Sequence, residues 1–261
     1  MKKILTIAGS DPSGGAGIEA DLKTFSAHGI YGMSCITALT AQNTTGVFGV
    51  KATPHEFFKK MLSACIIDIF PDAVKIGMAV SSDIMTVIAK IITKYNLKNI
   101  VLDPVMVASS GAVLLDPDAI EALVTKLFPL ASIITPNIPE AEKLTGLKIS
   151  TEEDIKNAAK ILSKTTSAAI LIKGGHSLKE ENTANDLLFE NGEMHWLSSP
   201  RVKNPNTHGT GCTLSSAIAC NLAKGHKMRV AVQNAKNYIT KALLSNLNLG
   251  AGSGPLNHFV K

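Results

Sequence analysis

Short apolar runs alternate with longer amphipathic segments along most of the chain. The short runs are apolar at consecutive positions, as in strands that are buried on both faces of a parallel sheet. We predict strands at Ile4–Ala8, Ser34–Thr40, Ala73–Ile76, Ile100–Leu102, Ser132–Thr135 and Ala168–Ile172. The longer segments carry apolar residues at helical spacing. We predict helices at Ile18–His28, Pro54–Phe70, Asp83–Tyr95, Pro117–Phe128, Glu152–Ser163 and Leu214–Ala223.

This alternation is typical of an α/β fold, in which helices cover both faces of a mainly parallel sheet through right-handed crossovers. One stretch departs from it, because Ala184–Leu188 and Glu193–Leu197 flank Asn191-Gly192, a strong hairpin signal. An antiparallel hairpin on a parallel sheet is expected at an edge. No linker, repeat or low-complexity tract interrupts the chain, so residues 1–261 are predicted to form a single domain.

The composition is that of an ordinary globular protein, with 45% hydrophobic and 18% charged residues among 261. The net charge of +5 is spread along the chain and aromatic residues make up only 5%. Nucleic-acid binding is therefore not indicated, and the mild basicity favours anionic small molecules.

The chain carries no signal for a membrane or for export. The apolar run at the start is interrupted by Asp11 and a Gly/Ser-rich turn, too early for a signal peptide. No apolar stretch approaches the ~20 residues that span a bilayer. The four cysteines show no zinc-type spacing. We therefore expect a cytoplasmic protein with reduced thiols.

The most informative segment is Asn206–Ser215, which reads NTHGTGCTLS. Gly209, Thr210 and Gly211 precede an apolar run at helical spacing, so backbone N–H groups would be uncovered at a helix N-terminus, where negative charge is favoured. Cys212 lies in the same field, which lowers a thiol pKa from its usual ~8.5. A glycine-rich turn with a buried cysteine is the alternative, since short glycine motifs also occur by chance.

Other motifs in the chain decide between these interpretations. The segment resembles the anion-hole loop of the ribokinase superfamily, and the cysteine resembles that of the hydroxymethylpyrimidine/phosphomethylpyrimidine kinases of thiamine biosynthesis. In most superfamily members an Asp stands at this position. Further stretches that resemble the family follow in order, namely Ile7–Gly17, Ala20–Thr24, Thr37–Thr44, Lys75–Met78, Asp103–Met106, Thr135–Ala141 and Lys173–His176.

The resemblance implies a ribokinase-like three-layer sandwich and an ATP- and Mg²⁺-dependent kinase, in a homodimer. The substrate would be 4-amino-5-hydroxymethyl-2-methylpyrimidine, followed by its monophosphate. There is no Walker-A sequence, so the P-loop route is excluded. Gly209, Thr210 and Gly211 would stabilise the transition state through backbone donors, Cys212 would accept the substrate's proton, and Lys173 would lie near the transferred phosphoryl group.

The Asn-x-x-Glu pattern of Asn137 and Glu140 would face the triphosphate and magnesium, with Glu140 acting through coordinated water. A capping box is the structural alternative and is compatible with that role. Asp103, which ends a strand, could add negative charge near the same metal or could cap a turn. The adenine is expected between the Gly209 loop and a helix near Ala231–Leu244.

On the substrate side the resemblance points to Gly9, Asp21, Gln42, Met78 and Val105. Gln42 carries a carbonyl acceptor and an amide donor, which match the amino group and ring nitrogen of an aminopyrimidine. Met78 and Val105 would be apolar walls, although ordinary packing is the commoner role of a Met. Asp21 could instead be a carboxylate favoured by the start of its helix.

The chain departs from the family in one loop. Ala108–Ala112 reads ASSGA, without the lysine and the aspartate that the family usually has there, which puts lid closure in doubt. Two other functions compete: a pyridoxal/pyridoxine kinase on the same fold, and a catalytically silent regulator that binds a nucleotide or vitamin. The presence of Cys212, Lys173, Asn137 and Glu140 argues against the silent regulator.

Overall fold

The computed structural model describes residues 1–106, 115, 117–174 and 182–260. The strands are β1 (Lys3–Ala8), β2 (Tyr31–Ile36), β3 (Ala38–Asn43), β4 (Gly46–Ala52), β5 (Ala73–Ile76), β6 (Ile100–Leu102), β7 (Ile133–Ile134), β8 (Ala169–Lys173), β9 (Thr183–Glu190) and β10 (Glu193–Pro200). The helices are α1 (Gly17–Ala27), α2 (His55–Asp68), α3 (Ser82–Tyr95), α4 (Pro117–Ala122), α5 (Ile138–Thr145), α6 (Glu152–Leu162), α7 (Thr210–Ala223) and α8 (Met228–Leu244). A π-helical segment (Leu123–Leu127) and a 3₁₀ turn (Phe128–Leu130) follow α4.

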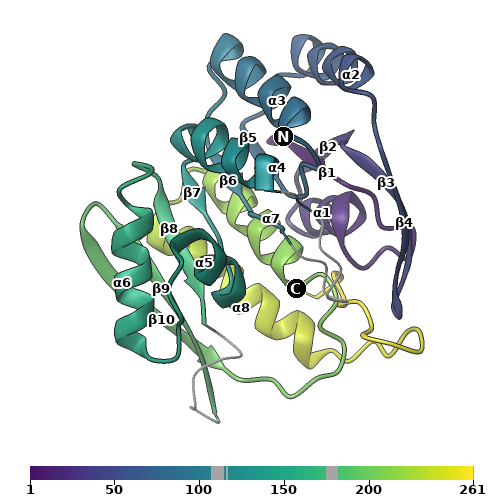
Figure 1. Cartoon of the computed structure of the whole chain (residues 1–261). Helices are drawn as coiled ribbons and strands as arrows, with labels where there is room; N and C mark the ends of the chain where they lie inside the picture. Colours follow the sequence, from purple (N-terminus) through teal and green to yellow (C-terminus); the bar gives the residue numbers. More distant parts are fainter. Residues whose placement is uncertain (107–114, 116, 175–181, 261) are drawn as a thin grey trace.

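Eight strands form one sheet in the order β10-β9-β8-β7-β6-β5-β1-β2 (Figure 1). The strands from β8 to β2 pair in parallel, whereas β9 and β10 are antiparallel. The edge hairpin is therefore confirmed, and Asn191 and Gly192 form its turn with positive φ angles of 52° and 84°. Both angles suit the turn of a two-residue hairpin.

Helices cover both faces of the sheet and bury a separate core on each. Side chains from α2, α3, α4, α5 and α6 pack on one face, and those of α1, α7 and α8 pack on the other. The resulting three layers match the predicted architecture (Figure 1). No helix among the described residues has the length and apolar character needed to cross a bilayer.

Local sequence explains why α3 begins and ends where it does. Ser81 accepts a hydrogen bond from the N–H of Ile84 and so caps the start of the helix. Asn96 adopts the left-handed conformation at the other end, with a φ of 51°. The apolar positions between them form one stripe that packs into the core, namely Ile84, Met85, Ile88, Ile91 and Ile92.

The predicted strand at Ser34–Thr40 is wrong in its extent. The chain leaves the main sheet after Ile36, and Ala38 begins a separate two-stranded sheet, β3–β4. Thr37 makes the change of direction, because its N–H bonds to Ala8 and its hydroxyl donates to the carbonyl of Met78. This small sheet stands beside the main one (Figure 1). Its strand β3 carries Gln42, which lines a cavity.

Candidate active site

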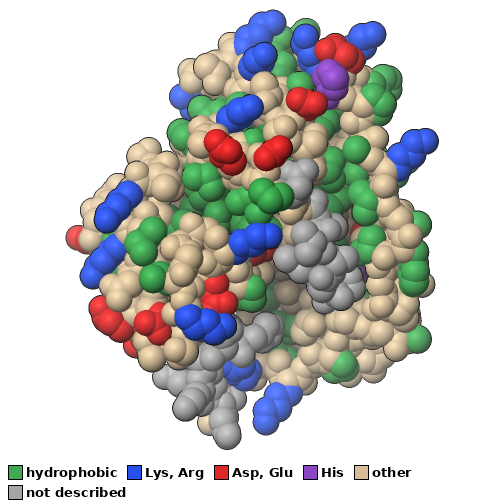
Figure 2. Space-filling view, viewed as in Figure 1, with side chains coloured by type: hydrophobic (Ala, Val, Ile, Leu, Met, Phe, Trp, Pro, Cys, Tyr) green, Lys and Arg blue, Asp and Glu red, His purple; other side chains and the backbone are tan. Residues whose placement is uncertain are grey.

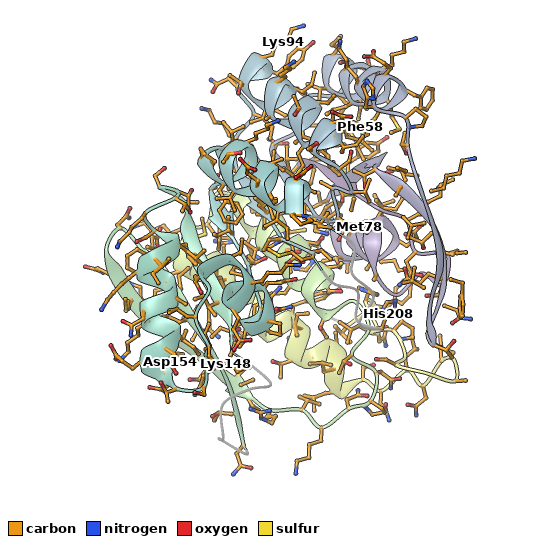
Figure 3. All side chains as sticks on the ribbon, viewed as in Figure 1. Phe58, Met78, Lys94, Lys148, Asp154 and His208 are labelled. Carbon is orange, nitrogen blue, oxygen red and sulfur yellow. The ribbon has the colours of Figure 1, made fainter. Side chains whose placement is uncertain are left out.

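A cavity of about 480 Å³ opens at the carboxyl ends of the parallel strands, as expected for an open α/β sheet. Its walls come from the segments that follow β1, β5, β6, β7 and β8, together with β3, β9, β10, α7 and α8. Met78 and His208, which both line the cavity, lie well inside the outline of the molecule, whereas Lys94 lies at its edge (Figure 3). On the face seen in Figure 2, the described acidic and basic side chains are interspersed rather than gathered by sign.

The first turn of α7 forms part of the cavity wall. Gly209 precedes the helix in the left-handed conformation with a φ of 81°, and a Cβ there would lie 1.8 Å from the carbonyl oxygen of Gly15. Only glycine fits this position. Among the described residues no side chain caps this end of α7. The N–H of Thr210 donates to the carbonyl of Thr207 at 3.3 Å, which leaves the N–H groups of Gly211 and Cys212 in this turn for an anion.

Lys173 and Asp103 form an ion pair beside that turn, with Nζ and Oδ1 2.9 Å apart. Thr135 donates a second hydrogen bond to the same carboxylate oxygen at 3.1 Å. Although burial opposes ionisation, Lys173 and Lys75 lower the pKa of Asp103 below its usual value. A Cβ at Gly211 would lie 3.4 Å from both charged groups, so this glycine lets the helix start approach the pair closely.

Asn137 and Glu140 form the predicted capping box at the start of α5. The Asn137 side chain accepts from the N–H of Glu140, and the Glu140 carboxylate accepts from the N–H of Asn137, both at 2.8 Å. Both side chains also line the cavity. Burial and the negative charge of Asp103 raise the pKa of Glu140 to about 7, against the opposing effect of Lys173.

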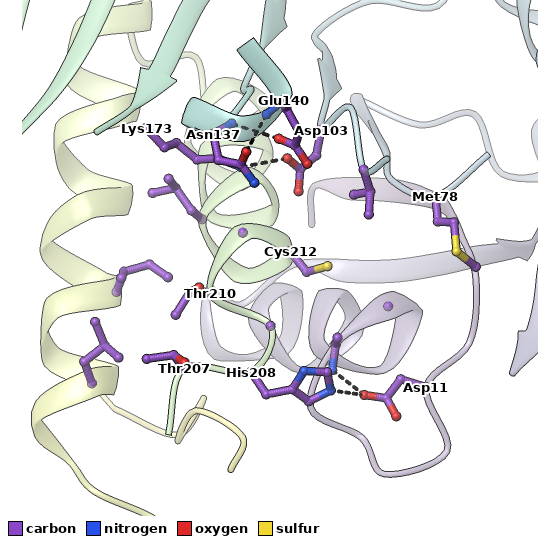
Figure 4. Close-up of a pocket in the computed structure, with 18 of the residues that line it drawn as sticks. Asp11, Met78, Asp103, Asn137, Glu140, Lys173, Thr207, His208, Thr210 and Cys212 are labelled. Atoms are coloured by element: carbon purple, nitrogen blue, oxygen red, sulfur yellow. Dashed lines mark hydrogen bonds and ion pairs between the residues drawn. The ribbon is translucent and has the colours of Figure 1, made fainter. Parts of the chain in front are cut away.

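Cys212 lies between the Lys173–Asp103 pair and the Asp11–His208 pair at the other end of the cavity (Figure 4). The expected lowering of its thiol pKa is wrong. Burial raises the pKa to about 11, and Asp21 and Asp103 add to the rise while Lys75 opposes it. The thiol is therefore protonated at neutral pH in the free protein.

Four of the five predicted substrate residues line the cavity: Gly9, Gln42, Met78 and Val105. A Cβ at Gly9 would lie 2.2 Å from Cε of Met78, so the absence of a side chain at Gly9 leaves room for that methionine. The amide nitrogen of Gln42 lies 3.3 Å from Nε2 of His208.

The fifth residue, Asp21, does not line the cavity. Its side chain is fully buried behind the wall, where both carboxylate oxygens lie 2.9 Å from Nζ of Lys75. Thr6 and Ser216 also donate to it, at 2.5 and 2.7 Å. Both carboxylate oxygens of Asp21 already accept hydrogen bonds from protein groups. The position of Asp21 therefore does not support the prediction that it contacts the substrate directly.

Sequence reasoning assigned no role to two further pairs in the cavity. Asp11 and His208 lie 2.7 Å apart, and Asp186 and Lys236 lie 2.6 Å apart. Asp186 lies in the middle of β9, and Lys236 lies on the buried face of α8. An ionisable residue at a position where the pattern predicts a buried side chain was the sequence signal that could have identified each of them. The lid loop with Ser109 and Ala112, and Gly175 and His176 of the Lys173 motif, lie outside the described residues.

Comparison with known proteins identifies the family. The phosphomethylpyrimidine kinase family model matches residues 11–257. The chain is 47% identical to hydroxymethylpyrimidine/phosphomethylpyrimidine kinase of Haemophilus influenzae, over 100% of this chain and 97% of that one. It is 49% identical to the thiamine biosynthesis bifunctional protein ThiED of Geobacter sulfurreducens, over 98% of this chain but only 52% of that protein, about half its length.

Solved structures agree with this assignment. Phosphomethylpyrimidine kinase from Clostridium difficile superposes with a TM-score of 0.82 at 49% identity, covering 93% of this chain and 99% of that one. An ADP complex of Bacillus subtilis pyridoxal kinase superposes with a TM-score of 0.91 at 39% identity, covering 99% and 97%. The predicted ribokinase-like fold is thereby confirmed, and the chain belongs to the phosphomethylpyrimidine kinase family.

Proposed function

We propose that this kinase transfers a phosphoryl group from ATP to the hydroxymethyl group of 4-amino-5-hydroxymethyl-2-methylpyrimidine and then to the resulting monophosphate. The observation that carries this proposal is a single cavity that joins two chemically different ends. One end offers the Gln42 amide and the apolar Met78, and the other offers Lys173 and the start of α7. Cys212 lies between them (Figure 4). The names of the relatives support the same substrate class.

The nucleotide would occupy the end of the cavity beside α8. Ile239, Thr240 and Leu243 line it there, and they suit an adenine ring better than a phosphate. The triphosphate would then extend toward the first turn of α7 and Lys173. The ADP complex of the related pyridoxal kinase supports ATP as the phosphoryl donor.

The residues at the phosphoryl end also fit a magnesium ion. Asp103 and Glu140 supply hard oxygen donors, and Asn137 lies beside them. Each carboxylate already accepts hydrogen bonds from protein groups, which favours contact with the ion through coordinated water. When bound, the ion would neutralise part of the triphosphate charge.

In the transfer, the substrate oxygen forms its bond to the γ-phosphorus while the bond from that phosphorus to the ADP oxygen breaks. Cys212, as the thiolate, would accept the hydroxyl proton late in this step. Lys173 and the N–H groups of Gly209 and Gly211 would stabilise the charge on the transferred group, whereas the N–H of Thr210 donates to the carbonyl of Thr207. Asp21 would act indirectly, since its bonds to Lys75 and Ser216 tie α1 and β5 to the helix that carries Cys212.

We further propose that residues 1–261 form one kinase domain and that two copies associate through the β3–β4 sheet. Leu39 is 54% exposed and Phe48 is 70% exposed there, and burial of these two apolar side chains would favour the association. A cytoplasmic location would suit the four cysteines, which are all free.

The experiment that tests the substrate is an ATP-consumption assay with hydroxymethylpyrimidine and with pyridoxal, side by side. We expect the pyrimidine to be used with the higher kcat/KM and to yield first the monophosphate and then the pyrophosphate. Preference for pyridoxal would make the protein a pyridoxal kinase, and turnover of neither would indicate a silent regulator. Either result contradicts the proposal.

A further inference from the structure

The ring of His208 is locked between two segments that are far apart in the sequence. It is 6% exposed, and its backbone N–H donates to the carbonyl of Gly254 at 3.1 Å. A Cβ at Gly15 would lie 2.4 Å from Cδ2 of the ring, so the glycine-rich loop closes over one side. Pro255 lies beside Gly15 and forms an isolated bridge with the backbone of His208. The ring therefore has little freedom to turn.

Its contact with Asp11 decides which ring nitrogen carries the proton. Nε2 of His208 lies 2.7 Å from Oδ2 of Asp11. That carboxylate is 1% exposed and also accepts hydrogen bonds from Ser13, Gly15 and Ala16. Although burial opposes it, the hydrogen bonds from His208 and Ser13 and the charge of His208 lower the pKa of Asp11 to about 2. An ionised carboxylate only accepts, so Nε2 of His208 must donate.

This proton makes one orientation of the neighbouring amide unfavourable. With Nε2 of Gln42 turned to His208, two donors face each other at 3.3 Å. The same orientation sets Oε1 of Gln42 3.3 Å from the Thr40 hydroxyl, whose proton already goes to the carbonyl of Ser10 at 2.9 Å. Rotating the Gln42 amide by 180° exchanges its oxygen and nitrogen without changing the space that it occupies, and makes both contacts favourable. Oε1 then faces the Nε2–H group of His208, whose proton goes mainly to Asp11, so the repulsion between two donors is replaced by a favourable contact with an acceptor. Nε2 of Gln42 donates to Thr40.

The amide so oriented keeps one lone pair and one N–H for the cavity that Gln42 lines. We propose that Asp11 and His208 are positioning residues that fix the polarity of the Gln42 amide and thereby select a ligand edge with an amino donor beside a ring nitrogen. This inference rests on the proposed aminopyrimidine substrate. Without the fixed proton the amide could turn, and a ligand with the opposite polarity would bind equally well.

The tautomer can be measured directly on the wild-type protein. Long-range ¹H–¹⁵N correlation spectra of the ¹⁵N-labelled full chain should show His208 protonated at Nε2 at neutral pH. The signals are assigned by their loss in His208→Gln or His208→Leu, whichever folds, with the exposed His226→Gln as the matched control. Asp11→Asn keeps the ring and should shift the same signals. Protonation at Nδ1 alone would overturn the proposal, whatever the substrate is.

Selectivity supplies the second readout. Calorimetry compares binding of hydroxymethylpyrimidine with that of 5-hydroxymethyl-2-methylpyrimidine, which lacks the amino group. In His208→Leu we expect the preference for the amino compound to fall by roughly 10- to 100-fold, mainly through KM in the kinase assay. His208→Gln, whose amide can donate from a similar position, should stay within about threefold of wild type.

An equal loss for both compounds in His208→Leu would mean that His208 only supports the loop before α7, and would overturn the inference. Failure of the wild type to phosphorylate the aminopyrimidine would instead count against the proposed function. The two failures are thus distinguishable.

Discussion

Two buried Lys–Asp ion pairs in this kinase have the same nitrogen–oxygen distance but different surroundings. Lys75 and Asp21 lie 2.9 Å apart, and neither side chain has any exposed surface. Lys173 and Asp103 also lie 2.9 Å apart, but both line the cavity and the lysine side chain is 15% exposed. The same chemistry therefore ties elements together in one place, and in the other it would face the transferred phosphoryl group of the proposed reaction. Access to the cavity, rather than residue type, separates the two roles.

The largest effect is expected at Cys212, which lies in the electrostatic field of both pairs. Cys212→Ala should lower kcat by roughly 10²–10⁴-fold, the range for a lost general base. ATP binding should remain near normal, because the change removes no group from the α8 end of the cavity. Single-turnover kinetics and nucleotide titration check both statements. Turnover within a few-fold of wild type would show that the thiol only fills space.

Exchanging each lysine for methionine tests the comparison itself. Lys173→Met should lower kcat by about 10²–10³-fold, as when one donor to a developing charge is removed. Lys75→Met should instead lower the free energy of unfolding by about 3–5 kcal/mol, because it leaves Asp21 buried without its counter-charge. Urea unfolding and kcat, measured for both variants, should give opposite rankings. The comparison fails if Lys75→Met unfolds like wild type but loses turnover.

The pH dependence of kcat/KM should reveal the state of the base. Only the thiolate can accept a proton, and with a pKa of about 11 its fraction rises about tenfold per pH unit below that value. Between pH 7 and pH 9 we therefore expect a rise of roughly 100-fold. In Cys212→Asp the carboxylate is already ionised, so the same range should be nearly flat. A flat profile in the wild type would argue against Cys212 as the base.

The sequence was sufficient for the main sheet because its strands are short apolar runs bounded by turn residues. It was insufficient at Thr37, where no glycine, proline or Asn marks the point at which the chain leaves the sheet. The β3–β4 turn at Thr44 and Thr45 also lacks the residues that signal a tight hairpin. Departures of this kind depend on contacts with distant segments, such as the bond from Thr37 to Met78.

Within the site, motif resemblance located the residues and burial decided their roles. Asp21 and Asp103 are both aspartates in family-like motifs, and only the packing of α1 against α7 shows that Asp21 faces Lys75 rather than the cavity. The raised pKa of Cys212 has the same origin. A helix N-terminus is visible in the sequence, whereas the burial that outweighs it arises from the assembled layers.

The smallest predicted effect concerns the metal and separates the capping role of Glu140 from its proposed role at the phosphoryl end. Its pKa of about 7 means that the carboxyl is increasingly protonated as pH falls below 7. A protonated Glu140 would no longer attract the hydrated magnesium ion through its negative charge. The magnesium concentration for half-maximal rate should therefore rise several-fold from pH 8 to pH 6. Glu140→Gln, which can keep the cap but not the charge, should have a high requirement at every pH. A variant that instead melts at a much lower temperature, with an unchanged magnesium requirement, would show that Glu140 serves α5 alone.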